Sequence, residues 1–208
     1  AADFIDSNID VVIGGGLNHF DVRKDGRKIT EEMQKKGFAF FNNLPKDASQ
    51  YKKLLVLIDT VHPPSILKGR GDLLLNGTKL ALQSLSKNKN GFFLMVEGSQ
   101  IDWSAHDNDS ASLINEMIDF DNVVGMTMKY ADDNPGTLVV ITADHETGGL
   151  TFVSKKKSKI VKFHFSSDDH SAVVVPVFAY GTGAKNFTGY YDNTDIFHKI
   201  LKTAGINK

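Results

Sequence analysis

The 208-residue sequence predicts an α/β fold in which helices cover a largely parallel β-sheet. Short apolar runs typical of buried strands alternate along the chain with longer stretches of helical periodicity, and this alternation favours parallel strands joined by helices. Hydrophobic residues make up 41% of the chain and charged residues 24%, the balance of an ordinary globular protein. No internal repeat or long linker divides the sequence, so we expect a single α/β domain portion over residues 1–208.

Strands are expected where the apolar runs are densest. These runs cover residues 9–16, 51–60, 91–98, 136–145 and 171–181. Residues 159–165 alternate between polar and apolar side chains, which is typical of one arm of an antiparallel hairpin. The lysine-rich segment 154–159 before it is expected to form a solvated turn.

Four stretches have the pattern of helices: residues 30–37, 71–91, 104–131 and 193–205. Thr30 is expected to cap the first, and Gly37 to end it. Asn193 or Thr194 is expected to cap the last, because short polar side chains accept hydrogen bonds from the free N–H groups of a first turn.

Composition excludes several classes of function. The net charge of −1 gives no general attraction to nucleic acid or to an anionic membrane. No apolar stretch approaches the roughly 18 to 20 residues that a membrane span needs. The sequence contains no cysteine, so any metal must be held by histidine, carboxylate or hydroxyl groups. No signal peptide is visible at the start, although a mature or truncated chain would look the same.

Side chains that bind metals follow two of the expected strands. Glu97 ends one run, and the pair Asp144–His145 ends another. Ligands of α/β sheets bind outside the carboxyl ends of the strands, so these groups would meet at one edge if the strands are parallel. Asp102 and His106 are four residues apart and would share one face of a helical turn. Either pair alone is more typical of an exposed helix pair or a turn, but together they predict a metal site.

The place of His170 is left open by the sequence, because this residue precedes a strand instead of following one. It reaches the predicted site only if that strand runs against the others or if its loop folds over the sheet edge. Gly14–Gly16 follows a strand but matches neither common phosphate-binding loop, and a tight turn is the better interpretation. Asp107 and Asp109 lack the further ligand and glycine of a calcium loop.

Several blocks together resemble the C-terminal half of alkaline phosphatases. They are "MVEGSQIDWSAH", "VVITADHETGGL" and "HSAVVVPVFAYGTGA" with "DNTDIFHKIL", and "DVVIGGGLNHF" resembles a further segment ahead of them. The blocks stand in the family's order and span nearly the whole chain. The resemblance implies a three-layer α/β/α sandwich with a largely parallel central sheet, incomplete in this sequence.

The resemblance also implies ligand roles for the same side chains that the pattern singles out. Asp102, His106 and His170 correspond to the ligands of one zinc ion, Asp144 and His145 to ligands of a second, and Glu97 to a ligand of magnesium. Trp103 stands where family members carry a basic or imidazole side chain near the phosphate, so it departs from the family pattern there.

The resemblance implies hydrolysis of small phosphate monoesters through a phosphoserine intermediate, by a periplasmic or secreted homodimer. The family's serine nucleophile lies in an N-terminal half that this sequence does not contain. Asp109–Ser112 copies the nucleophile motif, but we expect ordinary helix there. The 208-residue chain alone is therefore expected to be inactive. The alternatives are a phosphodiesterase, sulfatase or phosphomutase with the same metal core, or a metal-binding module without catalysis.

Overall fold

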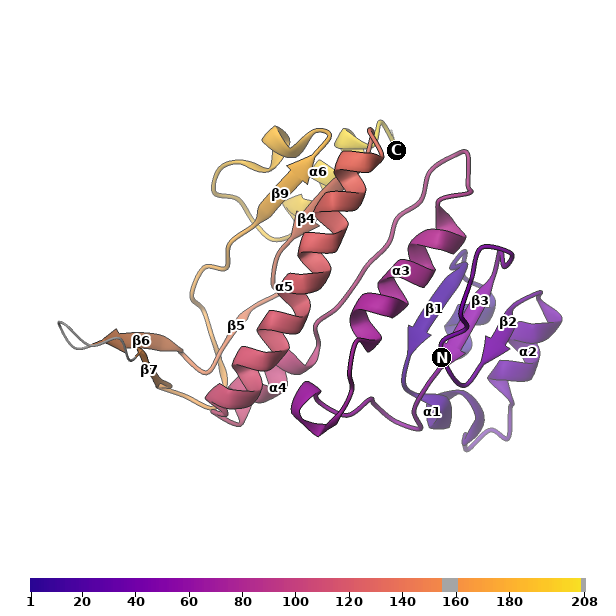
Figure 1. Ribbon diagram of the computed structural model, residues 1–208, viewed down its shortest axis with the longest axis horizontal. Coiled ribbons are helices and arrows are strands. Elements are labelled where there is room, and N and C mark those ends of the chain that lie inside the picture. Colours follow the sequence, from indigo (N-terminus) through magenta and orange to yellow (C-terminus); the bar gives the residue numbers. More distant parts are fainter. Residues whose placement is uncertain (155–160, 207–208) are drawn as a thin grey trace. The chain divides into compact units, whose positions relative to one another are not determined.

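The computed structural model describes residues 1–154 and 161–206, and these form two compact units, Ala1–Gly98 and Ser99–Lys208 (Figure 1). The predicted lysine-rich turn lies almost wholly outside the described residues. The expectation of a single domain portion stays a prediction. No helix among the described residues is long and apolar enough to cross a membrane.

The first unit is built on a parallel sheet of three strands. Its order is β1 (Val11–Gly14), β3 (Leu54–Leu57) and β2 (Ala39–Phe41), so β3 is central. All four residues of β3 are buried, with at most 1% of their surface exposed. A strand covered on both faces reads as a continuous apolar run, which is why the sequence predicts this strand.

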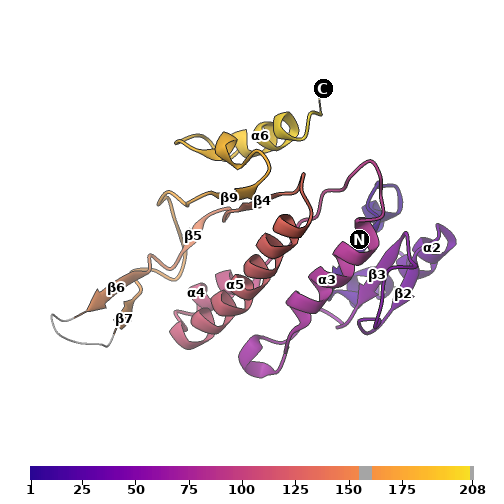
Figure 2. The ribbon, with the colours of Figure 1, turned by 45° about the horizontal axis from the view of Figure 1, so that its top comes forward.

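Helices cover both faces of this sheet. Successive side chains of a strand point to opposite faces, so Leu55 and Leu57 pack with Ile29 and Met33 of α2 (Ile29–Lys35). Leu54 and Val56 pack on the other face with Leu80 of α3 (Leu73–Leu85). The first unit therefore has three layers, with α2 and α3 on opposite sides of the sheet (Figure 2). The remaining short helices of this unit are η1 (Ala2–Ile5), α1 (Leu17–Asp21) and η2 (Ile66–Lys68).

Two predictions for the first unit need correction. Thr30 lies inside α2 and is not the cap of this helix. Its backbone N–H and its hydroxyl donate instead to the Asp21 carboxylate, at 3.1 and 2.6 Å. Residues 91–98 form no strand. A strand needs a neighbour that completes its ladder of backbone hydrogen bonds, and none of the described residues pairs with this run. Phe93 and Met95 are consequently 72% and 74% exposed.

In the second unit, two helices replace the single one predicted over 104–131. They are α4 (Gln100–His106) and α5 (Ser110–Asp133). The chain breaks at Asn108, whose φ of +53° is left-handed. Asp109 then caps α5 by accepting from the N–H groups of Ala111 and Ser112, at 3.0 and 3.1 Å. The nucleophile-like segment is thus a helix start and cap, and not the helix interior that we expected.

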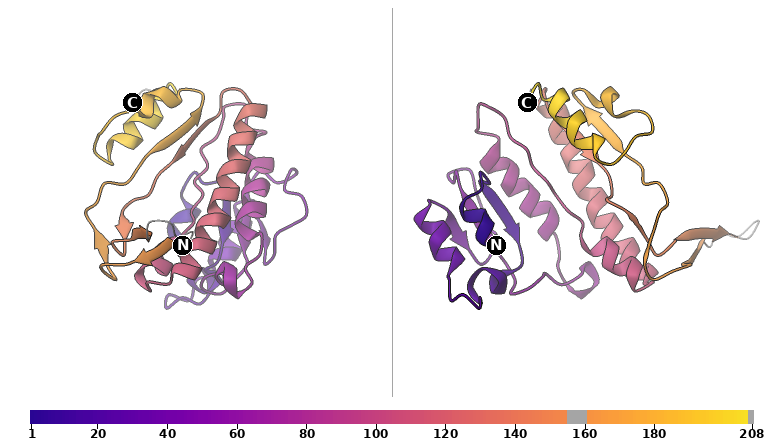
Figure 3. Two further views of the ribbon diagram at one scale, coloured as in Figure 1. Left: turned by 60° about the vertical axis from the view of Figure 1, so that its left-hand side comes forward. Right: turned by 180° about the vertical axis from the view of Figure 1, so that it is seen from behind.

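The strands of the second unit form three antiparallel pairs. Strand β4 (Leu138–Ile141) pairs with β9 (Phe178–Gly181), and both lie along α5 (Figure 3). The others are β5 (Glu146–Thr147) with β8 (His170–Ser171), and β6 (Thr151–Ser154) with β7 (Val161–His164). The β6–β7 pair confirms the predicted hairpin arm. The chain ends with η3 (Ala184–Phe187) and α6 (Asp195–Thr203).

The parallel part of the predicted sheet lies in the first unit, because all the ladders described in the second unit are antiparallel. One expectation for the strands of the second unit is corrected. The strand predicted over 171–181 is divided into the end of β8 and β9, with no ladder over 172–177. Pro176 lies in that gap and has no backbone N–H to donate.

Candidate metal centre

Helix α4 places two metal-binding side chains on one face. Asp102 and His106 are one turn apart, and Asp102 Oδ1 lies 3.5 Å from His106 Nε2. The helix is anchored through its buried residue Ser104, whose hydroxyl donates to the Gln100 carbonyl at 2.8 Å and contacts Ser112 Oγ of α5 at 3.0 Å. The pairing of Asp102 and His106 predicted from their spacing is therefore confirmed in geometry.

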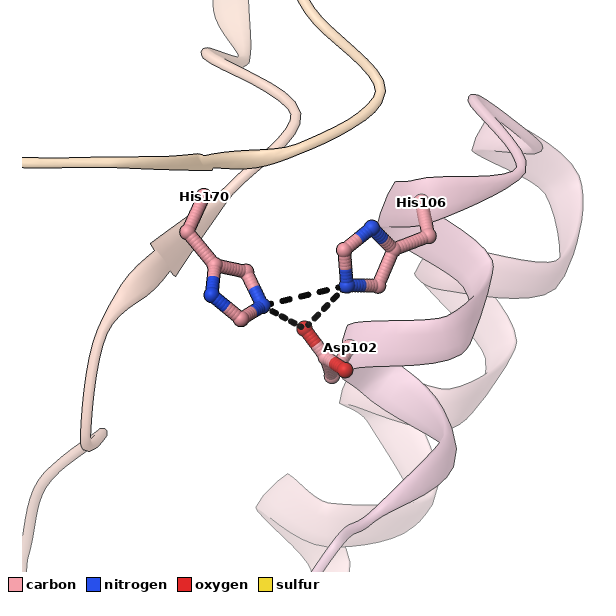
Figure 4. Close-up of side chains that lie close together, drawn as sticks. All are labelled: Asp102, His106 and His170. Carbon is pink, nitrogen blue, oxygen red and sulfur yellow. Dashed lines mark hydrogen bonds and ion pairs between the residues drawn. The ribbon is translucent and has the colours of Figure 1, made fainter.

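His170 joins this pair from strand β8. Its Nε2 lies 3.1 Å from His106 Nε2 and 3.7 Å from Asp102 Oδ1 (Figure 4). The antiparallel β5–β8 pair is what turns this histidine toward α4, so the condition that the sequence left open is met. Among the described residues, Asp102, His106 and His170 form the one group of at least three histidine or carboxylate side chains whose donor atoms lie close enough together to hold a metal ion.

The three donor atoms fit a single zinc ion. Zinc bonds to histidine nitrogen and carboxylate oxygen at about 2.0–2.1 Å with tetrahedral angles, so its ligand atoms are about 3.3–3.4 Å apart. The observed separations of 3.1, 3.5 and 3.7 Å lie around that value. The side chains of Asp102, His106 and His170 are 35%, 33% and 46% exposed. A fourth coordination position would therefore be open to solvent or substrate, as in catalytic zinc sites.

A backbone contact orients His106. Its Nδ1 lies 2.6 Å from the carbonyl oxygen of Asp168. In the neutral ring this contact requires the proton on Nδ1, which leaves the Nε2 lone pair directed at the other two donors. The same hydrogen bond, followed by the charge of Asp102, raises the pKa of His106 above its usual value against the opposing effect of burial. A proton therefore competes with a metal ion for the His106 ring more strongly than it would for the ring of an ordinary histidine.

Asp144 and His145 stand beside this centre. The His145 ring stacks on the His170 ring, with centroids 3.6 Å apart and an angle of 26° between their planes. Asp144 Oδ2 lies 3.4 Å from His145 Nε2, and the Asp144 side chain is 88% exposed. The structure thus brings His145 against the first group, while the role of Asp144 and His145 as ligands of a second zinc ion stays a prediction.

The roles of two further residues, Glu97 and Trp103, stay predictions. Glu97 lies in the first unit, at the end of the run that forms no strand, and its role as a magnesium ligand stays a prediction. Trp103 lies on α4 beside Asp102 and is 45% exposed. Its position near substrate is likewise a prediction.

Sequence reasoning missed two polar groups of this site. The Thr147 hydroxyl donates to Asp102 Oδ1 at 2.5 Å and lies 3.1 Å from His145 Nδ1. Its spacing of two residues from His145 was an available signal, because such residues share one face of a strand. The other group is the Asp168 carbonyl. A backbone acceptor is present at every residue, so no residue type could have indicated it.

Comparisons with known proteins find one family of similar proteins. The family model described as alkaline phosphatase matches residues 1–164 and 154–206. Alkaline phosphatase 4 of Bacillus subtilis is 32% identical over 94% of this chain, and the Escherichia coli alkaline phosphatase is 27% identical over 97%. The solved alkaline phosphatase of the Antarctic bacterium TAB5 matches the whole chain with a TM-score of 0.94 and 39% identity. A variant of that enzyme is described with Mg bound in a site called M3.

The relatives are longer than this sequence. The chain spans 58% of the B. subtilis protein, 54% of the E. coli protein and 64% of the TAB5 chain. The similarity nevertheless extends from the first residue of this chain to its last helix. The predicted resemblance and the predicted fold class are both confirmed: the chain belongs to the alkaline phosphatase family.

Proposed function

We propose that this chain is the metal-binding portion of a phosphate monoester hydrolase, and that Asp102, His106 and His170 hold one zinc ion. The triangle of donor atoms, with separations of 3.1, 3.5 and 3.7 Å, is the observation that carries the proposal. Its dimensions agree with the edges of a zinc tetrahedron, about 3.3–3.4 Å. Membership of the alkaline phosphatase family supports the choice of a monoester as substrate.

The three residues contribute one negative charge and two neutral nitrogen donors. Asp102 supplies the negative charge, and both histidines contribute neutral nitrogen donors, so the group keeps a net positive charge when it holds a divalent ion. When bound, zinc supplies positive charge that stabilises the phosphoryl oxygens and the departing alkoxide. The partial exposure of the three side chains leaves a path for a small phosphate ester. Trp103 would border that path on the same helix.

We further propose that Asp144 and His145 contribute to a second zinc ion and Glu97 to a magnesium ion. The contact of the His145 ring with the His170 ring supports two neighbouring metal positions, because it brings a further nitrogen donor beside the first group. The serine nucleophile of the proposed phosphoserine mechanism would come from the part of the enzyme that the chain does not span. A periplasmic or secreted homodimer, acting on small phosphomonoesters and binding neither nucleic acid nor membrane, completes the proposal.

The test joins residues 1–208 to the part of the TAB5 enzyme that this chain does not match. We expect the hybrid to release phosphate from 4-nitrophenyl phosphate at alkaline pH in the presence of zinc, whereas the 208-residue chain alone releases none. Asp102→Asn should abolish turnover by the hybrid. Asp133→Asn is the matched control, because it removes an equal charge from an exposed α5 residue that pairs with Lys129.

Two results would contradict the proposal. One is a hybrid whose phosphate release survives both complete chelation of zinc and the Asp102→Asn change. The other is a folded, zinc-loaded hybrid that hydrolyses a phosphate diester or a sulfate ester but not the monoester. That second result would favour a related enzyme with the same metal core.

A further inference from the structure

We propose that Thr147 is a positioning residue that joins the Asp102 carboxylate to the His145 ring through a single hydroxyl group. This inference rests on the proposed function, because it concerns residues that would hold the two zinc ions. The hydroxyl donates to Asp102 Oδ1 at 2.5 Å and lies 3.1 Å from His145 Nδ1. One side chain therefore contacts a proposed ligand from each metal position.

The number of hydroxyl protons decides what the second contact must be. A threonine hydroxyl has one proton to donate and lone pairs that accept. An ionised carboxylate can only accept, so the single proton of Thr147 is directed at Asp102. The hydroxyl must then accept from His145, which requires the ring proton to sit on Nδ1. This tautomer leaves a lone pair, and no proton, on His145 Nε2, which lies 3.4 Å from Asp144 Oδ2. A nitrogen that binds a metal needs this form.

The backbone around Thr147 holds the hydroxyl within reach of α4. Gly148 has a φ of +86°, and a side chain there would come within 3.1 Å of the Ala105 carbonyl of α4 and 2.9 Å of the Phe165 ring. Glycine is therefore required for β5 to approach α4 so closely.

The backbone of β5 also contacts His170, the third residue of the proposed zinc site. Thr147 pairs with His170 across the antiparallel β5–β8 ladder. The side chain of Thr147 thus positions Asp102 and His145, and its backbone positions His170. A substitution that keeps the strand but removes the hydroxyl separates these two contributions.

Thr147→Val is that substitution, because valine has the shape of threonine and suits a strand. In the metal-free chain at alkaline pH, nitrogen-15 NMR should find the His145 proton on Nδ1 in the wild type and distributed over both nitrogens in the variant. Calorimetric titration with zinc should show weaker binding by about 10- to 100-fold, the usual effect of losing a hydrogen bond behind a metal ligand. Thr147→Ser, which keeps the hydroxyl, should restore both properties.

Thr151→Val is the matched control. Thr151 also lies on a strand of the second unit, and its hydroxyl donates to the His164 carbonyl at 3.3 Å. This variant should bind zinc as the wild type does. Should Thr147→Val fail to fold, as judged by thermal unfolding, Thr147→Ala carries the same expectations.

The possible outcomes separate this inference from the proposed function. If zinc binding by the wild type does not depend on Asp102, so that Asp102→Asn binds zinc equally well or neither chain binds it, the proposed function fails. The NMR result then still decides the role of Thr147. If Thr147→Val binds zinc as tightly as the wild type, with or without a change of tautomer, the positioning role is overturned. A Thr147→Ser variant as weak as Thr147→Val would also overturn it, because packing would then explain the loss.

Discussion

The two units of this chain are stabilised in different ways. In the first, a parallel sheet is buried between two apolar clusters, and its central strand β3 is at most 1% exposed. In the second, the described strands form only two-stranded pairs, and the side chains of Asp102, His106 and His170 are one third to one half exposed. Packing holds the first unit together, whereas hydrogen bonds such as those of Thr147 and the Asp168 carbonyl position the groups of the second.

The apolar burial that stabilises the fold therefore lies in the first unit, and the side chains proposed to carry the chemistry lie in the second. Burial of apolar surface is the dominant source of folding free energy, and both apolar clusters found among the described residues lie in the first unit. A metal ion that binds a folded protein stabilises it by mass action. We therefore expect packing changes to act through the first unit and zinc to act through the second.

The largest effect is expected from Leu55→Ala in the centre of β3. Loss of this side chain from a fully buried position should lower the free energy of unfolding by about 2–5 kcal/mol, through lost burial and the cavity left behind. Urea unfolding of the metal-free chain measures this change. Zinc affinity at low urea should stay as in the wild type, and a parallel fall in affinity of the folded variant would break the separation of roles.

The next effect is the stabilisation supplied by zinc. At a free zinc concentration about 100 times Kd, the folded second unit should gain about 2.7 kcal/mol. Hydrogen exchange should slow in α4 and in the β5–β8 pair but not in β3. His106→Gln should remove this protection, while Lys129→Gln on the exposed face of α5 should keep it. Equal protection of β3 and α4 by zinc would contradict the comparison.

A smaller loss is expected from Asp109→Ala at the start of α5. The Asp109 carboxylate accepts from two N–H groups of the first turn, and removal of such a cap costs about 1 kcal/mol. Thermal unfolding checks this value, with Asp107→Ala as the control in the same turn. An unchanged melting temperature for Asp109→Ala would show that capping by this carboxylate does not stabilise the break between α4 and α5.

The smallest effect is expected from Asp25→Asn on the surface of the first unit. Hydrogen bonding to Arg23 lowers the pKa of Asp25 to about 2. A carboxyl group with a lowered pKa contributes stability above its unfolded value of about 3.8, and this contribution is lost as the pH falls through about 2. The pair is exposed, so the variant should be only slightly less stable than the wild type at pH 7. This small difference should shrink as the pH falls below about 4, because the wild type then loses the contribution that the variant lacks, and a large difference at pH 7 would contradict this.

The parts that sequence predicted well are those decided by local pattern. Strand β3 is a continuous apolar run because both of its faces are covered, and Asp102 and His106 share a face because of helical spacing. The position of His170 depended on the pairing of β8 with β5, a tertiary contact that no local pattern contains. Family resemblance was needed to assign this residue to the group.

The failures have equally specific causes. Residues 91–98 have the composition of a strand, but composition cannot supply a hydrogen-bonding neighbour. Asp109 is a residue type typical of helix caps, which indicates a helix start at this point. The helical periodicity of the apolar residues nevertheless predicted one continuous helix across Asn108 and Asp109. Thr147 was passed over because a hydroxyl that bonds to ligands is less conspicuous in a sequence than the ligands themselves.

The most direct test of the central claim is X-ray absorption at the zinc edge, on the 208-residue chain loaded with one equivalent of zinc. Grouping of Asp102, His106 and His170 predicts four nitrogen and oxygen neighbours at about 2.0–2.1 Å, with outer-shell scattering from two imidazole rings. The Asp102→Asn chain, loaded in the same way, should lose the four-coordinate signal. A wild-type spectrum without imidazole scattering, or with six water-like neighbours, would contradict the assignment of these three residues as a zinc site.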